Sequence, residues 1–225
     1  MGQSNVNENR DLLLRNEGLM FFGTINRSVT HELNNVMAII NERSGLMDDL
    51  LMAENQGIPM DSEKFKQLSK KIAVQVERGK ILIKRLNRFA HSTDELVTSF
   101  NLNTLLEDIT NLSQRLANLQ NLQLEIKLSG ESISLISNPF FLQQAVYICF
   151  ELFMAVPEKN HLITIELKKH ETTARVIISG TFLADTEAVL SKRALLDVLL
   201  EELKGSVQVI TENENRQLII LTIPV

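Results

Sequence analysis

Residues 21–51, FFGTINRSVTHELNNVMAIINERSGLMDDLL, constrain the fold of this chain more than any other stretch. The stretch contains no proline and only two glycines, so it can form one long helix. Its apolar residues recur mostly at three- and four-residue steps, which is the spacing of a single buried face on a helix. These residues are Phe22, Ile25, Val29, Leu33, Val36, Ile40, Met47 and Leu51. The rest of the fold must therefore supply a surface that covers this face.

The same stretch carries a polar patch that contains a histidine. His31 lies two residues from an apolar position on either side, so at about 100° per residue its side chain points away from the apolar face. Glu32 follows directly, and Arg27 and Asn35 lie one turn before and after the histidine. A zinc-protease interpretation of HELNN fails, because that motif needs a second histidine where Asn35 stands. The patch therefore predicts an exposed imidazole next to a carboxylate, without a metal.

HELNN, preceded by FFGTINRSVT and followed by MAII, resembles the H-box of two-component sensor histidine kinases. The resemblance implies that His31 carries a phosphoryl group on a helical domain that also mediates dimerisation. It implies that Glu32 takes a proton from the second ring nitrogen, and that Asn35 stands where relatives position a water molecule for removing phosphate from a receiver domain. Many relatives have proline where this chain has Val36, so we expect a helix without that kink.

A second helix follows the first after a short connection. We expect the first helix over about residues 10–53, a turn at 54–60, and an N-cap for the second helix at Asp61. The second helix has a matching apolar face: Phe65, Leu68, Ile72, Val76, Ile83, Leu86 and Ala90. Because a lone hairpin leaves half of each apolar face in water, we predict a homodimer in which two hairpins form a four-helix bundle. The alternative is that these faces pack on the C-terminal half of the same chain.

The composition narrows the classes of function. The net charge is −5, which argues against nucleic acid as the main partner. No apolar run reaches the roughly 18–20 residues that a membrane-spanning helix needs, and the polar N-terminus does not resemble a signal peptide. The single cysteine, Cys149, excludes a disulfide framework, so we expect a reduced, cytoplasmic protein. The second helix is strongly basic, which predicts either a solvated face or a docking surface for an acidic partner.

A polar linker at residues 91–101 predicts a boundary between two domains, which we place at 1–96 and 97–225. In the second domain, Thr104 and Glu107 have the spacing of a capping box at the start of a helix. Further on we expect strands at 122–128 and 132–136, a helix opened by Asn138-Pro139 that runs to about Val156, a strand pair at 163–169 and 174–179, a helix at 186–203, and strands at 206–211 and 217–223. This order predicts an α+β fold, with a mixed sheet that helices cover on one face.

The second domain resembles the ATP-binding domain of histidine kinases through FNLNTLLEDI, NPFFLQQAV and LKGSVQV…LIILTIP. The family holds Mg²⁺–ATP with an asparagine on one helix, the aspartate of a D-x-G-x-G segment and a second glycine-rich stretch. Here the asparagine position is Leu152, preceded by Glu151, and the D-x-G-x-G position is 179–183, SGTFL, without an aspartate. No glycine lies between Gly180 and Gly205. We therefore expect no ATP binding and no bound cofactor.

Together these patterns favour a histidine phosphotransfer protein of a two-component phosphorelay, similar to the histidine phosphotransferases of kinase-like build. We expect it to exchange a phosphoryl group between His31 and aspartates of response-regulator receiver domains, with Mg²⁺ supplied by the receiver. His31, Glu32 and Asn35 are the expected site residues. Two alternatives stay open: an atypical sensor kinase that autophosphorylates His31 with ATP, and a non-catalytic pseudokinase scaffold that binds a receiver domain or a histidine kinase.

Overall fold

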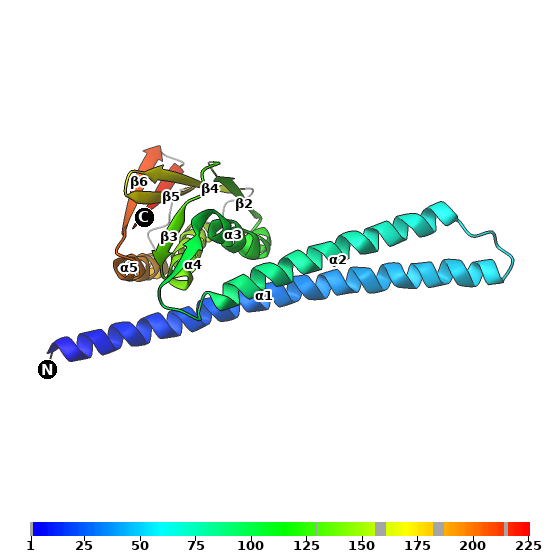
Figure 1. Ribbon diagram of the computed structural model, residues 1–225, viewed down its shortest axis with the longest axis horizontal. Helices are drawn as coiled ribbons and strands as arrows, with labels where there is room; N and C mark the ends of the chain where they lie inside the picture. The colour runs from blue at the N-terminus through cyan, green and yellow to red at the C-terminus, as the bar shows by residue number, and fades with distance from the viewer. Residues whose placement is uncertain (1, 129, 156–160, 182–186, 214–215) are drawn as a thin grey trace. The chain divides into compact units, whose positions relative to one another are not determined.

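The computed structural model describes residues 2–128, 130–155, 161–181, 187–213 and 216–225. The chain divides into two compact units (Figure 1). One unit, Asn26–Arg88, is a helical hairpin, and the other combines Met1–Ile25 with Phe89–Val225 around a β-sheet. The division into folding domains at 1–96 and 97–225 stays a prediction.

Two long helices supply the hairpin unit, and both extend beyond it along the chain. Helix α1 spans Gly2–Asn55, longer at both ends than expected, and α2 spans Ser62–His91. Asp61 caps α2 as predicted, because its Oδ1 accepts a hydrogen bond from the backbone N–H of Lys64 at 2.9 Å. Between the helices the chain turns at Gly57, whose φ of 85° lies in the left-handed region that glycine adopts without strain.

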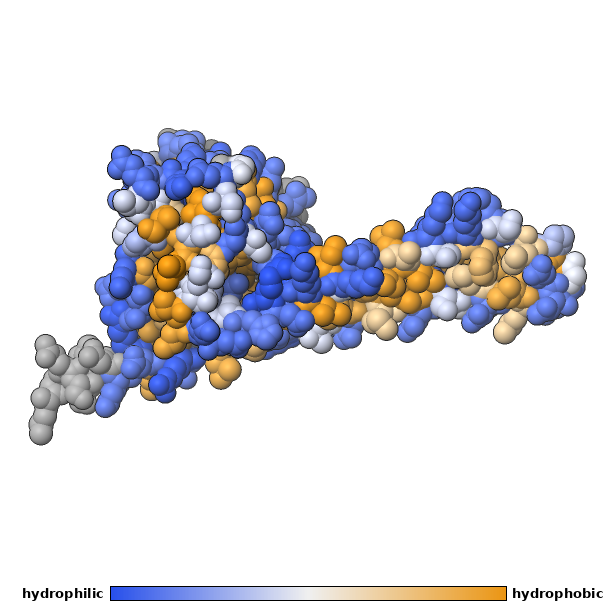
Figure 2. Space-filling view, in the orientation of Figure 1, coloured by the Kyte–Doolittle hydropathy of each residue, from blue (hydrophilic) through white to orange (hydrophobic). Residues whose placement is uncertain are grey.

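Within the hairpin unit the two helices lie side by side and antiparallel (Figure 1). Val36 of α1 is buried against α2, where a Cβ atom at Gly79 would lie 3.4 Å from Val36 Cγ1. On the part of α2 within this unit the buried apolar side chains are Leu68 and Leu82, whereas Ile83 of the expected apolar face is 49% exposed. Much apolar surface therefore stays open in the single chain, and Figure 2 shows orange, apolar surface along the hairpin. The exposed apolar residues of this unit include Met37, Leu51, Val74, Val76, Ile81 and Ile83.

The described residues of the second unit form a five-stranded mixed sheet in the order β2-β4-β5-β7-β6. Its strands are β2 (Leu122–Leu128), β4 (His161–His170), β5 (Thr173–Gly180), β6 (Ser206–Asn213) and β7 (Arg216–Pro224). Strand β2 pairs with β4 in parallel, and the other neighbours are antiparallel. Helices α3 (Leu102–Leu119), α4 (Pro139–Met154) and α5 (Glu187–Glu202) cover one face of the sheet (Figure 1). The predicted α+β fold with a mixed sheet is confirmed.

The core of this unit lies between the sheet and helix α4. Alternate residues of the central strands, such as Ile165, Val176 and Ile178, are fully buried, as expected for strands with one covered face. Helix α4 packs against both α3 and α5 and is buried along almost its whole length. The strongly apolar sequence of α4 matches this burial. Even so, no helix in the described parts of the chain has the length and hydropathy that crossing a membrane requires.

The start of the α/β unit differs from the sequence prediction. Helix α3 begins at Leu102, and its N-cap is Asn101, whose Oδ1 accepts a hydrogen bond from the Thr104 N–H at 2.8 Å. The predicted capping box is therefore wrong, because Thr104 already lies in the first turn of the helix. The end of the expected linker forms strand β1 (Thr98–Asn101), which pairs antiparallel with β3 (Ser134–Ser137).

The N-terminal part of α1 belongs to the α/β unit through two sets of contacts. Phe21 is buried in an aromatic cluster with Phe89, Phe140 and Tyr147, and its ring centroid lies 5.1–5.4 Å from theirs. Nearer the N-terminus, Arg10 forms ion pairs at 2.7 and 3.0 Å with the two glutamates that end α5. Through these contacts the N-terminal part of α1 packs as an element of the α/β unit.

Candidate functional site

The hairpin unit carries the three expected site residues on α1. His31 and Asn35 are exposed and lie one helical turn apart, so both side chains are open to solvent on the same side of the helix. Glu32 is turned differently, because its side chain is only 20% exposed and contacts α2. The structure thus brings the histidine and the asparagine to one surface and directs the glutamate toward the second helix.

Arg78 of α2 is the partner of Glu32. Its Nη2 donates a hydrogen bond to Glu32 Oε1, which forms an ion pair between the helices. From the sequence alone, Arg78 is only one of the many basic residues of the second helix. No local sequence signal points to this contact, because Arg78 and Glu32 lie 46 residues apart on separate helices.

Helix α2 presents a basic surface to solvent. Its few acidic residues include Glu77, which pairs with Lys80 at 3.4 Å. The exposed basic residues are Lys64, Lys66, Lys70, Lys71, Arg78, Lys80, Lys84 and Arg88. A surface of this kind attracts acidic proteins over several ångströms at moderate ionic strength.

The positions where the family resemblance predicts a nucleotide site lie in the α/β unit. Leu152, at the asparagine position, is fully buried in α4. Glu151 forms an ion pair with Lys192 of α5, with Nζ and Oε2 2.6 Å apart. This contact gives Glu151 a structural partner that no local sequence pattern indicates, because Lys192 lies 41 residues further along the chain.

The ring of Phe153 packs against Gly180, the last residue of β5. A Cβ atom at Gly180 would lie 2.6 Å from Cδ1 of the buried Phe153, so this ring packs directly on the glycine backbone. Ser179, the preceding residue, faces the other side of the sheet, where Arg216 Nη2 donates a hydrogen bond to its Oγ at 2.7 Å. The side of Gly180 that faces the helices is therefore filled. Residues 182–183, which complete the expected D-x-G-x-G position, lie outside the described residues.

Other reactive groups do not form a competing site. Cys149 is fully buried in α4, and burial raises the pKa of its thiol, so the sulfur stays protonated and out of reach. Within the described ranges, no group of three or more His, Cys, Asp or Glu side chains is arranged to hold a metal ion. The patch around His31 is therefore the candidate functional site.

Comparisons with known proteins bear on the fold. No protein-family model and no curated protein sequence matches the chain. The nucleotide-free catalytic domain of histidine kinase ThkA is similar in structure, with a TM-score of 0.50 and 16% identity over 57% of this chain and 95% of that domain. The histidine kinase AdeS of Acinetobacter baumannii matches with a TM-score of 0.49 and 16% identity, over 86% of this chain and 97% of that chain. ThkA in complex with the response regulator TrrA matches with a TM-score of 0.48 and 18% identity, over 93% of this chain and 64% of that chain. The first of these similarities shows that the chain contains the fold of a histidine kinase catalytic domain.

Proposed function

We propose that this chain is a histidine phosphotransfer protein of a two-component phosphorelay. It exchanges a phosphoryl group between His31 and the aspartates of response-regulator receiver domains, and it does so without ATP. One observation carries the proposal: an exposed histidine within an H-box-like sequence lies on a helical hairpin, in the same chain as a unit with the catalytic-domain fold.

The transfer step requires little from the histidine protein. A lone pair on one imidazole nitrogen attacks the phosphorus of the receiver's aspartyl phosphate, and an N–P bond forms as the P–O bond to the aspartate breaks. The aspartate leaves as a carboxylate, and the receiver supplies the Mg²⁺ that neutralises the phosphoryl oxygens. Positive charge on the imidazole is relieved when its second nitrogen gives a proton to a base, for which Glu32 is the adjacent carboxylate. The same steps in reverse return the phosphoryl group to an aspartate.

Three features of the α/β unit favour a relay over an ATP-dependent kinase. Leu152 offers no oxygen to a metal ion, and Glu151 is already engaged by Lys192. Ser179, which stands at the aspartate position of the D-x-G-x-G segment, has no carboxylate, and its Oγ accepts a hydrogen bond from Arg216. Because phosphoryl transfer from ATP depends almost wholly on positioning and charge, the replacement or engagement of all three groups together supports a relay that does not use ATP.

The proposed protein acts as a homodimer in the cytoplasm. Exposed apolar residues such as Met37, Val76 and Ile83 supply the surface for a second hairpin, and a four-helix bundle of two hairpins would cover them. The basic surface of α2 suits an acidic receiver domain. Asn35, exposed one turn from His31, could also hold a water molecule against a docked receiver and so support removal of its phosphate.

A phosphotransfer assay tests the proposal. Purified chain is incubated with a panel of phosphorylated receiver domains, and acid-labile, base-stable phosphohistidine is measured over time. Wild type and His170→Ala should become labelled, because His170 is an exposed histidine of the α/β unit that takes no part in the site. His31→Ala should stay unlabelled while its circular dichroism spectrum is unchanged. Labelling of a folded His31→Ala protein would contradict the proposal.

A calorimetric titration with Mg²⁺–ATP separates the alternatives. Saturable binding together with ATP-dependent labelling of His31 would favour an atypical kinase. A pseudokinase scaffold would bind a receiver or a histidine kinase equally well with and without His31 and would never become labelled. The relay requires that ATP does not bind and that labelling from a receiver depends on His31.

A further inference from the structure

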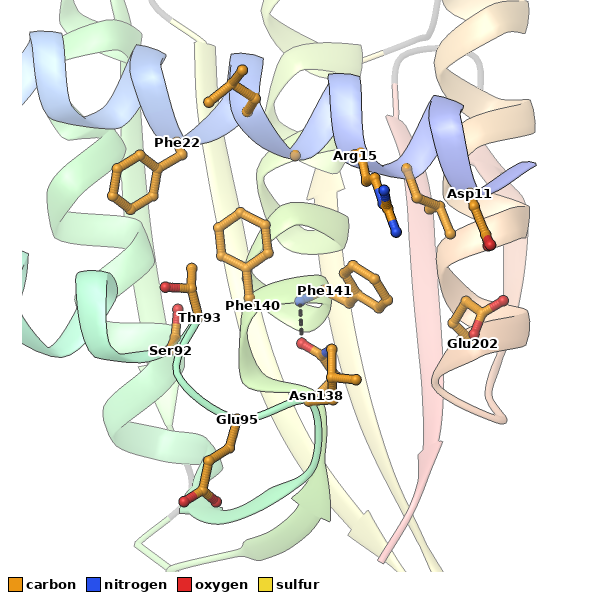
Figure 3. A pocket seen from close by; sticks show the side chains of 14 residues that line it. Asp11, Arg15, Phe22, Ser92, Thr93, Glu95, Asn138, Phe140, Phe141 and Glu202 are labelled. Carbon is orange, nitrogen blue, oxygen red and sulfur yellow. Dashed lines mark hydrogen bonds between the residues drawn. The ribbon is translucent and has the colours of Figure 1, made fainter. Parts of the chain in front are cut away.

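The α/β unit contains an open pocket of about 650 Å³ that is separate from the patch around His31 (Figure 3). Helix α1, the segment after α2, the start of α4 and the end of α5 line it. Apolar side chains form most of its wall: Leu14, Leu19, Phe22, Leu96, Phe140 and Phe141. A pocket of this size with an aromatic wall is typical of sites for small organic molecules.

Arg15 brings a charge to this apolar wall. Its guanidinium extends from α1 into the pocket, toward Phe141 (Figure 3). It forms no hydrogen bond or ion pair within the described residues. Three acidic residues line the pocket. Glu202 is paired with Arg10 at 3.0 Å, Glu95 points away from Arg15 (Figure 3), and Asp11 forms no ion pair with Arg15 in the part of the chain that the structure describes. The donors of Arg15 are therefore open toward the pocket.

Two polar side chains of the pocket lining, Asn138 and Ser92, already hold hydrogen bonds. Asn138 caps α4, because its Oδ1 accepts a hydrogen bond from the Phe141 N–H at 2.9 Å (Figure 3). Ser92 Oγ donates to the Phe89 carbonyl at 2.6 Å. Asp11 lies toward the end of the pocket near Glu202 (Figure 3). Among the described residues that line the pocket, Arg15 is thus the one cation, and it is available to a ligand, while the aromatic side chains are available to an apolar body.

We propose that this pocket binds a small amphiphilic anion. An apolar body would lie against Phe22, Phe140 and Phe141, and a single carboxylate, sulfonate or phosphate would pair with Arg15. The planar guanidinium of Arg15, which is exposed at the mouth of the pocket, matches these anions with two parallel hydrogen bonds. The inference concerns the α/β unit alone, so it does not rest on the proposed phosphotransfer.

Fluorescence titration with anilinonaphthalene sulfonate provides the test, because this probe combines an aromatic body with one anionic group. Its uncharged relative phenylnaphthylamine shares the body and lacks the anion. We expect saturable, one-to-one binding of the sulfonate to the full chain, and displacement by decanoate. Arg15→Gln should weaken binding of the sulfonate by about tenfold or more and leave phenylnaphthylamine unaffected.

Two further variants keep the test decisive. Arg175→Gln removes an exposed arginine of β5 outside the pocket and should change neither affinity. Thr93→Trp places a large ring at an exposed position in the pocket lining and should weaken both probes while thermal unfolding stays cooperative. The proposal is overturned if Arg15→Gln leaves the sulfonate affinity unchanged, if it weakens both probes equally, or if Thr93→Trp weakens neither.

Discussion

Arg78 Nη2 donates a hydrogen bond to Glu32 Oε1, and this ion pair joins the two helices of the hairpin at the residue that follows His31. The pair is partly exposed, so its contribution to stability is about 0–1 kcal/mol. The ion pair matters more for its position beside His31 than for its contribution to stability. It sets the direction of the carboxylate that the proposed transfer uses as a base, which makes Arg78 a positioning residue.

We expect Arg78→Ala to slow phosphoryl transfer from a receiver to His31 by about tenfold at saturating receiver, because the Glu32 carboxylate loses its orientation. Single-turnover labelling at several receiver concentrations measures the rate and the apparent affinity separately. Lys71→Ala is the matched control. It removes a positive charge two turns earlier on the same face of α2, where the side chain is exposed.

A double-mutant cycle shows whether Arg78 acts through Glu32. In a Glu32→Gln background, Arg78→Ala should cause no further loss of rate, and Arg78→Lys should retain part of the wild-type rate. A different outcome identifies another role. If Arg78→Ala raised only the receiver concentration needed for half-maximal rate, and did so equally in both backgrounds, Arg78 would belong to the receiver-docking surface.

The proposed dimer depends on apolar residues that the single hairpin leaves open. Ile83→Glu should raise the dimer dissociation constant by about tenfold or more, because a carboxylate would be buried without a partner at the interface. Sedimentation velocity over a concentration series measures this change. Leu162→Glu is the matched control, since Leu162 of β4 is 47% exposed and Ile83 is 49% exposed. Equal dissociation constants for the two variants would argue against this surface as the interface.

The contact between Gly180 and Phe153 predicts a stability effect. Gly180→Ala should lower the free energy of unfolding by about 1–3 kcal/mol, because the new methyl group overlaps the ring. Urea unfolding followed by circular dichroism provides the measurement. Gly130→Ala serves as the control, since no atom lies within 4 Å of a Cβ atom built there. Adding Phe153→Leu to Gly180→Ala should restore part of the loss, and a failure to do so would place the strain elsewhere.

The cap of α3 gives a prediction that separates two neighbouring residues. Asn101→Ala should lower the free energy of unfolding by about 1 kcal/mol, because the Thr104 N–H loses its acceptor. Thr104→Ala should change it by less than about 0.5 kcal/mol, since the Thr104 side chain does not cap the helix. Urea unfolding of the two variants side by side is the measurement. A larger loss of unfolding free energy for Thr104→Ala than for Asn101→Ala would instead support the capping box that the sequence predicts.

Local sequence signals predicted much of the fold. Alternating leucines and isoleucine gave strand β2 at Leu122–Leu128, and Asn138 followed by proline marked the start of α4. The error at α3 has a physical reason. Two good capping residues stand three positions apart, and Asn101 holds the cap while Thr104 donates to it. Strand β1 was missed because four residues are too few to show an alternating pattern.

In the candidate site, too, local sequence patterns predict some residues and miss others. The patch of His31, Glu32 and Asn35 follows from one helical stretch, so sequence spacing alone identifies it. Arg78 is 46 residues from Glu32, and Lys192 is 41 residues from Glu151, so both partners depend on the packing of separate helices. The register of those helices is set by many apolar contacts. No local pattern carries that information.

The packing of Phe153 on Gly180 also limits which single substitutions the chain tolerates at these two positions. A larger residue at position 180 is blocked while the ring remains, because even one added carbon would lie 2.6 Å from it. A smaller residue at position 153, introduced first, would leave a cavity and cost about 2–5 kcal/mol. Each single replacement thus lowers stability before the second can compensate. A larger side chain at the end of β5 therefore requires replacements at both positions, so we expect residues 153 and 180 to tolerate change only as a pair.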